Sequence, residues 1–151
     1  MERVSKRNYY LDIAQTVLER ATCLRRVYGA IIVKNDEIIS TGYNGAPRGR
    51  VNCSELGYCN REQLRIPSGQ RYELCRSVHA EANAITKVAK SANNCDGSTL
   101  YITAAPCIEC SKLIIQAGIR RVVYSDDYRS EEGLDLLRRV GIECVQIPGE
   151  E

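Results

Sequence analysis

The chain contains a single histidine, His79, among its 151 residues. One histidine excludes every site that needs two, including the HExxH zinc hydrolases and the three-histidine zinc centre. No apolar run approaches the roughly 18 residues that a membrane helix needs, and the N-terminal residues lack the apolar core of a secretory signal. We therefore expect no membrane partner and a cytoplasmic location.

An excess of one charge is also missing. Lys and Arg number 21 against 19 for Asp and Glu, which gives a formal net charge of +2. Proteins that bind nucleic acid usually carry a far more basic surface, so we expect no nucleic-acid partner. The chain is 44% hydrophobic and 26% charged, as is usual for a folded protein, and its length fits one domain over residues 1–151.

Helical and strand-like patterns alternate along the chain. The expected helices cover about residues 5–23, 79–92, 107–117 and 131–140, and the expected strands cover residues 28–34, 37–43, 99–103, 122–125 and 142–147. The first two strands form a hairpin that turns at Asn35-Asp36. This order predicts an α/β fold with one mixed five-stranded sheet, its later strands parallel, and helices on both faces.

A long segment at about residues 44–78 has little periodicity. We call it the insert. A loop of that length inside a compact domain is usually functional or held in place by something. It carries six arginines against three glutamates. We expect at least one of these arginines to bind a phosphate group, with Arg48 and Arg50 the first candidates.

Two short motifs at expected helix starts carry the chemistry. The first is His79-Ala80-Glu81, and the second is Pro106-Cys107-Ile108-Glu109-Cys110. Cys107 and Cys110 are three residues apart, so both sulfurs project from one helical face, in a first turn that favours the thiolate. One imidazole and two thiolates with an open fourth position are typical of catalytic zinc.

Glu81 is the expected catalytic base. Zinc with two thiolates and a neutral imidazole is close to neutral and acidifies its water weakly, so another group must take the proton. Glu81 lies two residues from His79, which makes it a poor ligand from the same turn but lets it reach the zinc water. We expect it to pass that proton to a ring nitrogen and to shuttle a further proton to the departing ammonia. The combined pattern matches zinc nucleobase deaminases.

With these residues in place, the sequence resembles the zinc-dependent deoxycytidylate (dCMP) deaminases over nearly its whole length. The segments that carry the likeness are Thr22–Ala30, Gly42–Gly49, Cys75–Ile85 and Ala105–Cys110. The resemblance implies a three-layer α/β/α fold and hydrolysis of dCMP to dUMP and ammonia, which supplies thymidylate synthesis. It also implies a homohexamer that dCTP activates and that dTTP inhibits together with Mg²⁺.

The resemblance also assigns residues. His79, Cys107 and Cys110 match the zinc ligands, and Glu81 matches the proton shuttle. The implied contacts with the substrate's base and sugar come from Asn44, Ala80, Tyr124 and Tyr128. A core position in the strand is an equally good interpretation of Tyr124. The implied effector-binding segment consists of Gly42, Tyr43, Asn44 and Gly45.

Four further cysteines lie in or near the insert and indicate a second, structural zinc. They are Cys23, Cys53, Cys59 and Cys75. Four thiolates make a closed zinc site, and related viral enzymes hold a second zinc there with Cys, His and Glu ligands. This chain has no spare histidine, so Cys59 and Cys75 would have to substitute. Buried or free thiols are the alternative.

Other functions fit the same motifs. Within the zinc deaminases, the substrate could be dCTP, free cytidine, a tRNA adenosine or a riboflavin precursor. Outside enzymes, the chain could be a zinc-stabilised interaction module, or a silent deaminase relative used for DNA uptake or regulation. Glu81 argues against silence, because a structural zinc does not need a carboxylate two residues from its ligand.

Overall fold

The computed structural model describes residues 2–67, 69–128 and 130–147. The elements in chain order are α1 (Lys6–Val17), β1 (Gly29–Lys34), β2 (Glu37–Tyr43), α2 (Cys53–Leu56), α3 (Asn60–Gln63), α4 (Ala80–Ala89), β3 (Thr99–Ala104), α5 (Ile108–Ala117), β4 (Arg121–Asp126), α6 (Glu132–Arg139) and β5 (Glu143–Gln146), with short 3₁₀ turns at Leu18–Arg20 and Tyr72–Leu74. None of the helices in these ranges is both long and apolar enough to cross a membrane.

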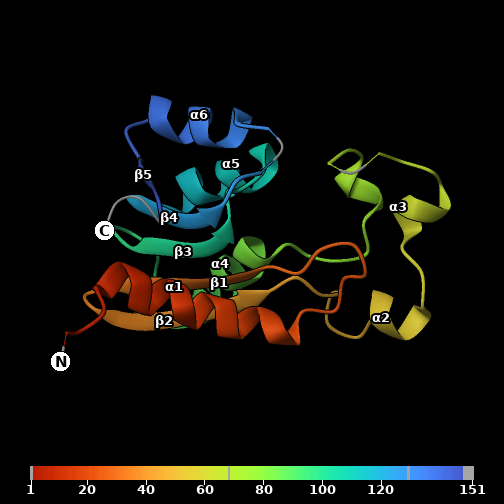
Figure 1. The fold of residues 1–151 in the computed structure, drawn as a ribbon, viewed down its shortest axis with the longest axis horizontal. Coiled ribbons are helices and arrows are strands. Elements are labelled where there is room, and N and C mark those ends of the chain that lie inside the picture. Colours follow the sequence, from red (N-terminus) through yellow and green to blue (C-terminus); the bar gives the residue numbers. More distant parts are fainter. Residues whose placement is uncertain (1, 68, 129, 148–151) are drawn as a thin grey trace.

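One mixed sheet lies at the centre of the molecule, with the strand order β2-β1-β3-β4-β5 (Figure 1). β1 runs antiparallel to β2 and β3, whereas β3, β4 and β5 run parallel. The predicted α/β sheet is thus confirmed. The carboxyl ends of β2 and β3 and the amino end of β1 meet at one edge, which is where ligands bind in many open α/β sheets.

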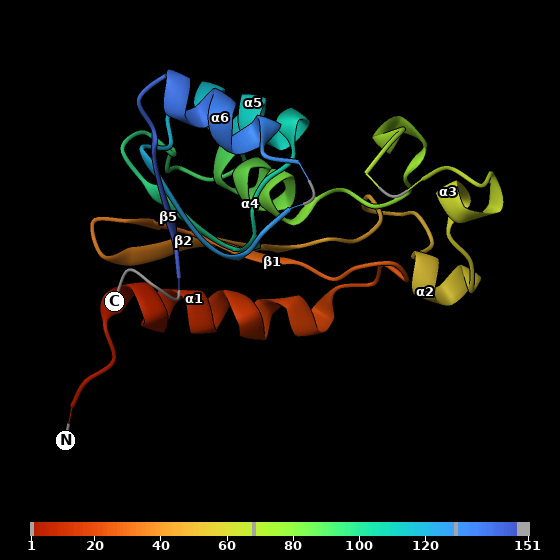
Figure 2. The same cartoon turned by 45° about the horizontal axis from the view of Figure 1, so that its top comes forward.

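Helices cover both faces of the sheet (Figure 2). Side chains in β1 alternate, so Ile31 and Val33 pack with the α1 residues Tyr10, Leu11 and Ala14. The opposite face packs against α4, α5 and α6 in a second apolar cluster. The arrangement is the three-layer α/β/α fold that the resemblance implies.

The turn between β1 and β2 forms where the sequence places it. Asn35 and Asp36 both have positive φ values, 53° and 61°, which a tight two-residue hairpin requires and which Asn and Asp tolerate. The Asp36 carboxylate accepts hydrogen bonds from the Tyr10 hydroxyl at 2.6 Å and from Lys6 Nζ at 2.8 Å. These bonds attach the turn to α1.

Three helix boundaries differ from the prediction, and each difference affects the site. The first helix ends at Val17 with a 3₁₀ turn to Arg20, after which Ala21 is extended, so Cys23 lies in a loop. His79 and Cys107 are the N-cap residues of α4 and α5 rather than their first helical residues. Their backbones are extended, and their side chains therefore stand at the helix ends.

The insert forms a lobe that extends to one side of the sheet (Figure 1). Its two ends are joined by a pair of backbone hydrogen bonds between Gly45 and Val78, with N···O distances of 3.2 and 2.7 Å. Between them lie α2, α3 and the 3₁₀ turn at Tyr72–Leu74. The expected long loop is therefore closed at its base and contains short helical pieces.

Candidate active site

Three soft ligands from two helix starts lie together at the sheet edge. Sγ of Cys107 is 3.6 Å from Nδ1 of His79, and Sγ of Cys110 is 3.3 Å from the same nitrogen. Among the described residues, these are the only three His, Cys, Asp or Glu side chains whose ligand atoms all lie within 4.8 Å of one another. Tetrahedral zinc places sulfur and nitrogen ligands about 3.5 Å apart, so the donor set and its spacing fit zinc.

The fold explains why these residues meet. Cys107 follows β3 after two intervening residues and is the N-cap of α5, and Cys110 lies in the first turn of α5. His79 caps α4, which packs against α5 over the same face of the sheet. Both helix starts therefore reach the same edge, where unpaired N–H groups and the helix dipoles favour thiolate over thiol.

The charge states of the three side chains are linked. The contact between the two sulfurs lowers the pKa of Cys107, and the same contact together with burial raises the pKa of Cys110. Burial lowers the pKa of His79, but the Cys107 and Glu81 contacts outweigh it and the net shift is upward. A dication at this position favours two thiolates and a neutral imidazole, so binding of zinc releases protons.

Glu81 lies in the first turn of α4 and is buried, with 4% of its surface exposed. Burial raises the pKa of its carboxyl group, and the nearby His79 partly offsets this rise. Glu81 lines the same pocket as His79 and Cys107. A carboxyl group with a raised pKa beside a metal site is suited to accept and return protons.

Asn44 lines the pocket, but both ends of its side-chain amide already have backbone partners. Its Oδ1 accepts from the N–H of Tyr28 at 2.8 Å, and its Nδ2 donates to the carbonyl oxygen of Arg26 at 2.8 Å. The buried amide thus holds the loop before β1 in place. The expected contact of Asn44 with substrate stays a prediction, because the amide keeps one N–H and one oxygen lone pair. The bracing role is an addition that the sequence did not indicate.

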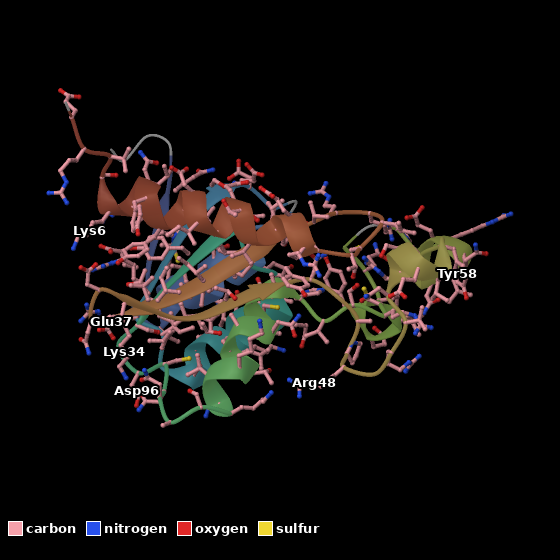
Figure 3. All side chains as sticks on the ribbon, turned by 90° about the horizontal axis from the view of Figure 1, so that it is seen from below. Lys6, Lys34, Glu37, Arg48, Tyr58 and Asp96 are labelled. Carbon is pink, nitrogen blue, oxygen red and sulfur yellow. The ribbon has the colours of Figure 1, made fainter. Side chains whose placement is uncertain are left out.

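The predicted phosphate-binding arginines lie elsewhere. Arg48 and Arg50 are exposed and line a separate groove on the outside of the molecule, and Figure 3 shows Arg48 where the chain enters the insert. The arginines that line the candidate pocket are Arg25, Arg26 and Arg61. Arg25 and Arg26 lie in the segment Thr22–Ala30, which carries the family likeness. Their place in that segment is the signal that could have indicated these two arginines from the sequence.

Two further predicted contact residues belong to the core. Tyr124 is 4% exposed and Ala80 is fully buried, and both pack in the apolar cluster between the sheet and α4–α6. Neither lines the pocket, whereas Tyr128 does. Gly42 is also a packing position, because a Cβ atom there would collide with the backbone of Ala80 and Ala84 in α4. These placements favour the core interpretation of Tyr124.

The four cysteines of the predicted second zinc site are all free thiols, and three of them, Cys23, Cys59 and Cys75, lie near enough to Cys53 to affect its pKa. Burial raises the pKa of Cys53, and the neighbouring thiols of Cys23, Cys75 and Cys59 add to this shift. They do not form a compact ligand group like that at His79. Cys23 and Cys75 also line the candidate pocket.

Comparison with known proteins is consistent with this geometry. Residues 4–126 match the cytidine and deoxycytidylate deaminase zinc-binding region. The deoxycytidylate deaminase of Enterobacteria phage T4 is 34% identical, with 95% of this chain and 90% of that protein covered. ComE operon protein 2 of Bacillus subtilis is 37% identical, with 97% and 74% covered.

A solved structure supports the same relationship. The dCMP deaminase of the cyanophage S-TIM5, crystallised in complex with dCMP and dUMP, superimposes with a TM-score of 0.81 at 34% identity. The match covers 97% of this chain and all of that one. The likeness extends over the sheet, the helix starts and the insert, and this chain belongs to the cytidine and deoxycytidylate deaminase family.

Proposed function

We propose that this protein is a zinc-dependent hydrolase that converts dCMP and water to dUMP and ammonia. The observation that carries the proposal is the buried Glu81 carboxyl group in one pocket with His79 and Cys107, which form a ligand group with Cys110. The relatives named deoxycytidylate deaminase and the S-TIM5 complex with dCMP and dUMP support this substrate. The dUMP product would supply thymidylate synthesis.

His79, Cys107 and Cys110 are the proposed zinc ligands. Bound zinc supplies a polarised water at its open fourth position. Two thiolates and a neutral imidazole balance the charge of the dication, so the site depends on Glu81 for proton transfer. Glu81 accepts one proton of the attacking water and donates it to the ring nitrogen beside the amino-bearing carbon. It then takes the second proton of the same oxygen and delivers it to the amino group, which leaves as ammonia.

Substrate contacts complete the proposal. Tyr128 lines the pocket and is placed to contact the base or the sugar. Asn44 acts by holding the Arg26–Tyr28 loop against the pocket. Ala80 and Tyr124 support the pocket from the core behind it. This division proposes direct contacts for Tyr128 and Asn44, which both line the pocket, and supporting roles for Ala80 and Tyr124.

The second groove is a candidate effector site. It is lined by Tyr43, Gly45, Arg48, Arg50, Lys87 and Lys90, and no acidic side chain of the described residues lines it. Such a cluster favours a polyphosphate, which is consistent with dCTP activation and with dTTP inhibition together with Mg²⁺. We include this regulation, a homohexamer and a cytoplasmic location in the proposal.

A second zinc held by Cys23, Cys53, Cys59 and Cys75 is also part of the proposal. Two observations support it: Cys53 and Cys59 are buried, and the thiols of Cys23, Cys59 and Cys75 contribute to the raised pKa of Cys53, although the four sulfurs do not form a group as compact as that at His79. Four thiolates would close such a site and leave no position for a reacting water. Its role would be to hold the insert in place.

The experiment that tests the function compares ammonia release from dCMP, dCTP, deoxycytidine and cytidine. We expect the highest kcat/KM with dCMP. Preference for another of the four substrates would indicate a different zinc deaminase. Zinc-loaded protein that acts on none of them would favour a non-catalytic module.

A further inference from the structure

We propose that Arg61 of the insert binds the 5′-phosphate of the substrate and that Tyr72, as a positioning residue, links this contact to His79. The inference rests on the proposed function and adds residues to it. Arg61 lies in α3 and lines the candidate pocket. It would make the insert the part of the chain that distinguishes a nucleotide from a nucleoside.

The guanidinium group of Arg61 is buried and has no carboxylate partner among the described residues. Only 6% of its surface is exposed, and its buried Nε atom has no hydrogen-bond partner. Nη1 donates to the carbonyl oxygen of Gln70 at 3.0 Å. No carboxylate of the described residues lies within 4 Å of the guanidinium. A buried charge without a counter-ion is costly, so an anionic ligand would stabilise it.

A second guanidinium strengthens the case. Nη1 of Arg25 is also buried without a hydrogen-bond partner, while its Nε pairs with Glu62, the neighbour of Arg61 in α3, at 3.6 Å. Arg25, Arg26 and Arg61 line the pocket together, against the single carboxyl group of Glu81. A phosphate monoester carries close to two negative charges and accepts paired hydrogen bonds from guanidinium groups. The pocket therefore offers the charge that a nucleotide phosphate requires.

Tyr72 connects Arg61 with the metal site. The Arg61 guanidinium carbon lies over the Tyr72 ring, 4.6 Å from its centroid. The same ring is nearly perpendicular to the His79 imidazole, at 89°, with centroids 4.6 Å apart. An ion held by Arg61 would fix the guanidinium and, through the Tyr72 ring, the orientation of His79. Binding energy from a non-reacting part of the substrate would then support the chemical step.

The contacts of Arg61 and Tyr72 predict that a free anion, not bonded to the nucleoside, activates turnover of deoxycytidine. Deoxycytidine lacks the phosphate and leaves Arg61 without its counter-ion. Inorganic phosphite, a dianion that fits the same guanidinium groups, should fill this position beside deoxycytidine and raise its kcat/KM at least tenfold. Phosphite should also compete with dCMP. Native protein whose deoxycytidine turnover does not respond to phosphite would overturn the link between Arg61 and the metal site.

The variants are Arg61→Gln and, as a matched control in the insert, Arg65→Gln. Arg65 is exposed and does not line the pocket. We expect Arg61→Gln to lower the ratio of kcat/KM for dCMP over deoxycytidine roughly 100-fold and to abolish phosphite activation, as loss of a charge-assisted pair predicts. Arg65→Gln should retain the native ratio. An unchanged ratio in zinc-loaded, folded Arg61→Gln refutes the phosphate contact.

Tyr72 is tested separately. Tyr72→Leu should lower kcat for dCMP more than it raises KM, and Tyr72→Phe should restore kcat because it keeps the ring. An equal loss of kcat in Tyr72→Leu and Tyr72→Phe contradicts the positioning role. If Arg61→Gln does not fold, the phosphite response of the native protein decides. Native protein inactive on dCMP refutes the proposed function itself, whereas native activity with an unchanged Arg61→Gln ratio refutes this inference alone.

Discussion

The sulfur of Cys110 lies 3.3 Å from Nδ1 of His79, although the two residues are 31 positions apart in the chain. The contact exists because α4 and α5 begin at the same edge of the sheet and present their first turns to one another. It brings a soft sulfur and an imidazole nitrogen to the spacing of zinc ligands. Glu81, on the first turn of α4 next to His79, shares the pocket that His79 and Cys107 line.

Glu81→Gln should separate metal binding from turnover. The amide keeps the shape of the side chain but cannot accept the proton, so we expect kcat for dCMP to fall roughly 10²–10⁴-fold while zinc content stays native. Turnover and metal analysis on the same preparation measure both effects. Glu81→Gln with near-native kcat would exclude Glu81 as the proton shuttle.

The sequence predicted the fold and the ligand group because local signals specify both. Asn35 and Asp36 mark the hairpin turn, and Pro106, Cys107 and Cys110 mark a helix start at the end of a strand. These features depend on neighbours within a few residues. Local signals therefore sufficed for the strands, for the hairpin and for the two helix starts that carry the candidate metal ligands, whereas the order of the strands in the sheet comes from the structure.

The second group of pocket residues depends on long-range packing. Arg61 and Tyr72 reach the pocket only because the insert folds back and closes at Gly45 and Val78. Arg25 reaches it because the chain leaves the helix after Arg20 rather than at Cys23. No local sequence pattern encodes these routes of the chain to the pocket. The excess of arginine in the insert indicated phosphate binding but did not identify which arginine binds.

The insert cysteines predict a measurable metal count. If Cys23, Cys53, Cys59 and Cys75 hold a structural zinc, the native protein should contain two zinc ions per chain and Cys53→Ser should contain one. Cys144→Ser, at a half-buried position in β5, is the control and should retain two. We also expect the insert of Cys53→Ser to be cleaved faster by protease. A native content of one zinc ion would remove the second site.

The outer groove predicts a separable effector response. Lys87→Gln should raise the dCTP concentration for half-maximal activation by about tenfold, because it removes one of the cations that would face the phosphates. Calorimetric titration of dCTP into the folded protein gives the matching change in Kd. Arg139→Gln, exposed on α6 and outside the groove, should bind dCTP like the native chain. Equal affinity in all three proteins would place the effector elsewhere.

Tyr10 and Asp36 predict a pH dependence of stability. The hydrogen bond to Asp36 and burial raise the pKa of Tyr10 from 10.0 to about 12. A raised pKa in the folded state contributes stability below pH 10, and this contribution is lost as pH rises through about 12. Tyr10→Phe should therefore melt roughly 2–4 °C below the native protein at pH 8.

The same comparison at alkaline pH provides the control. The difference in melting temperature between Tyr10→Phe and the native protein should shrink as pH rises from 10 toward 12. A difference that stays constant over this range would show that packing of the ring, rather than its hydroxyl group, is responsible.

Zinc reconstitution with dCMP as substrate tests the central claim most directly. Chelator-treated protein should be inactive, and dCMP turnover should rise in proportion to zinc bound at His79, Cys107 and Cys110 until that site is full. Cys110→Ala should lose this zinc and the activity together. Full dCMP turnover by metal-free protein, or by Cys110→Ala without zinc, would contradict the account.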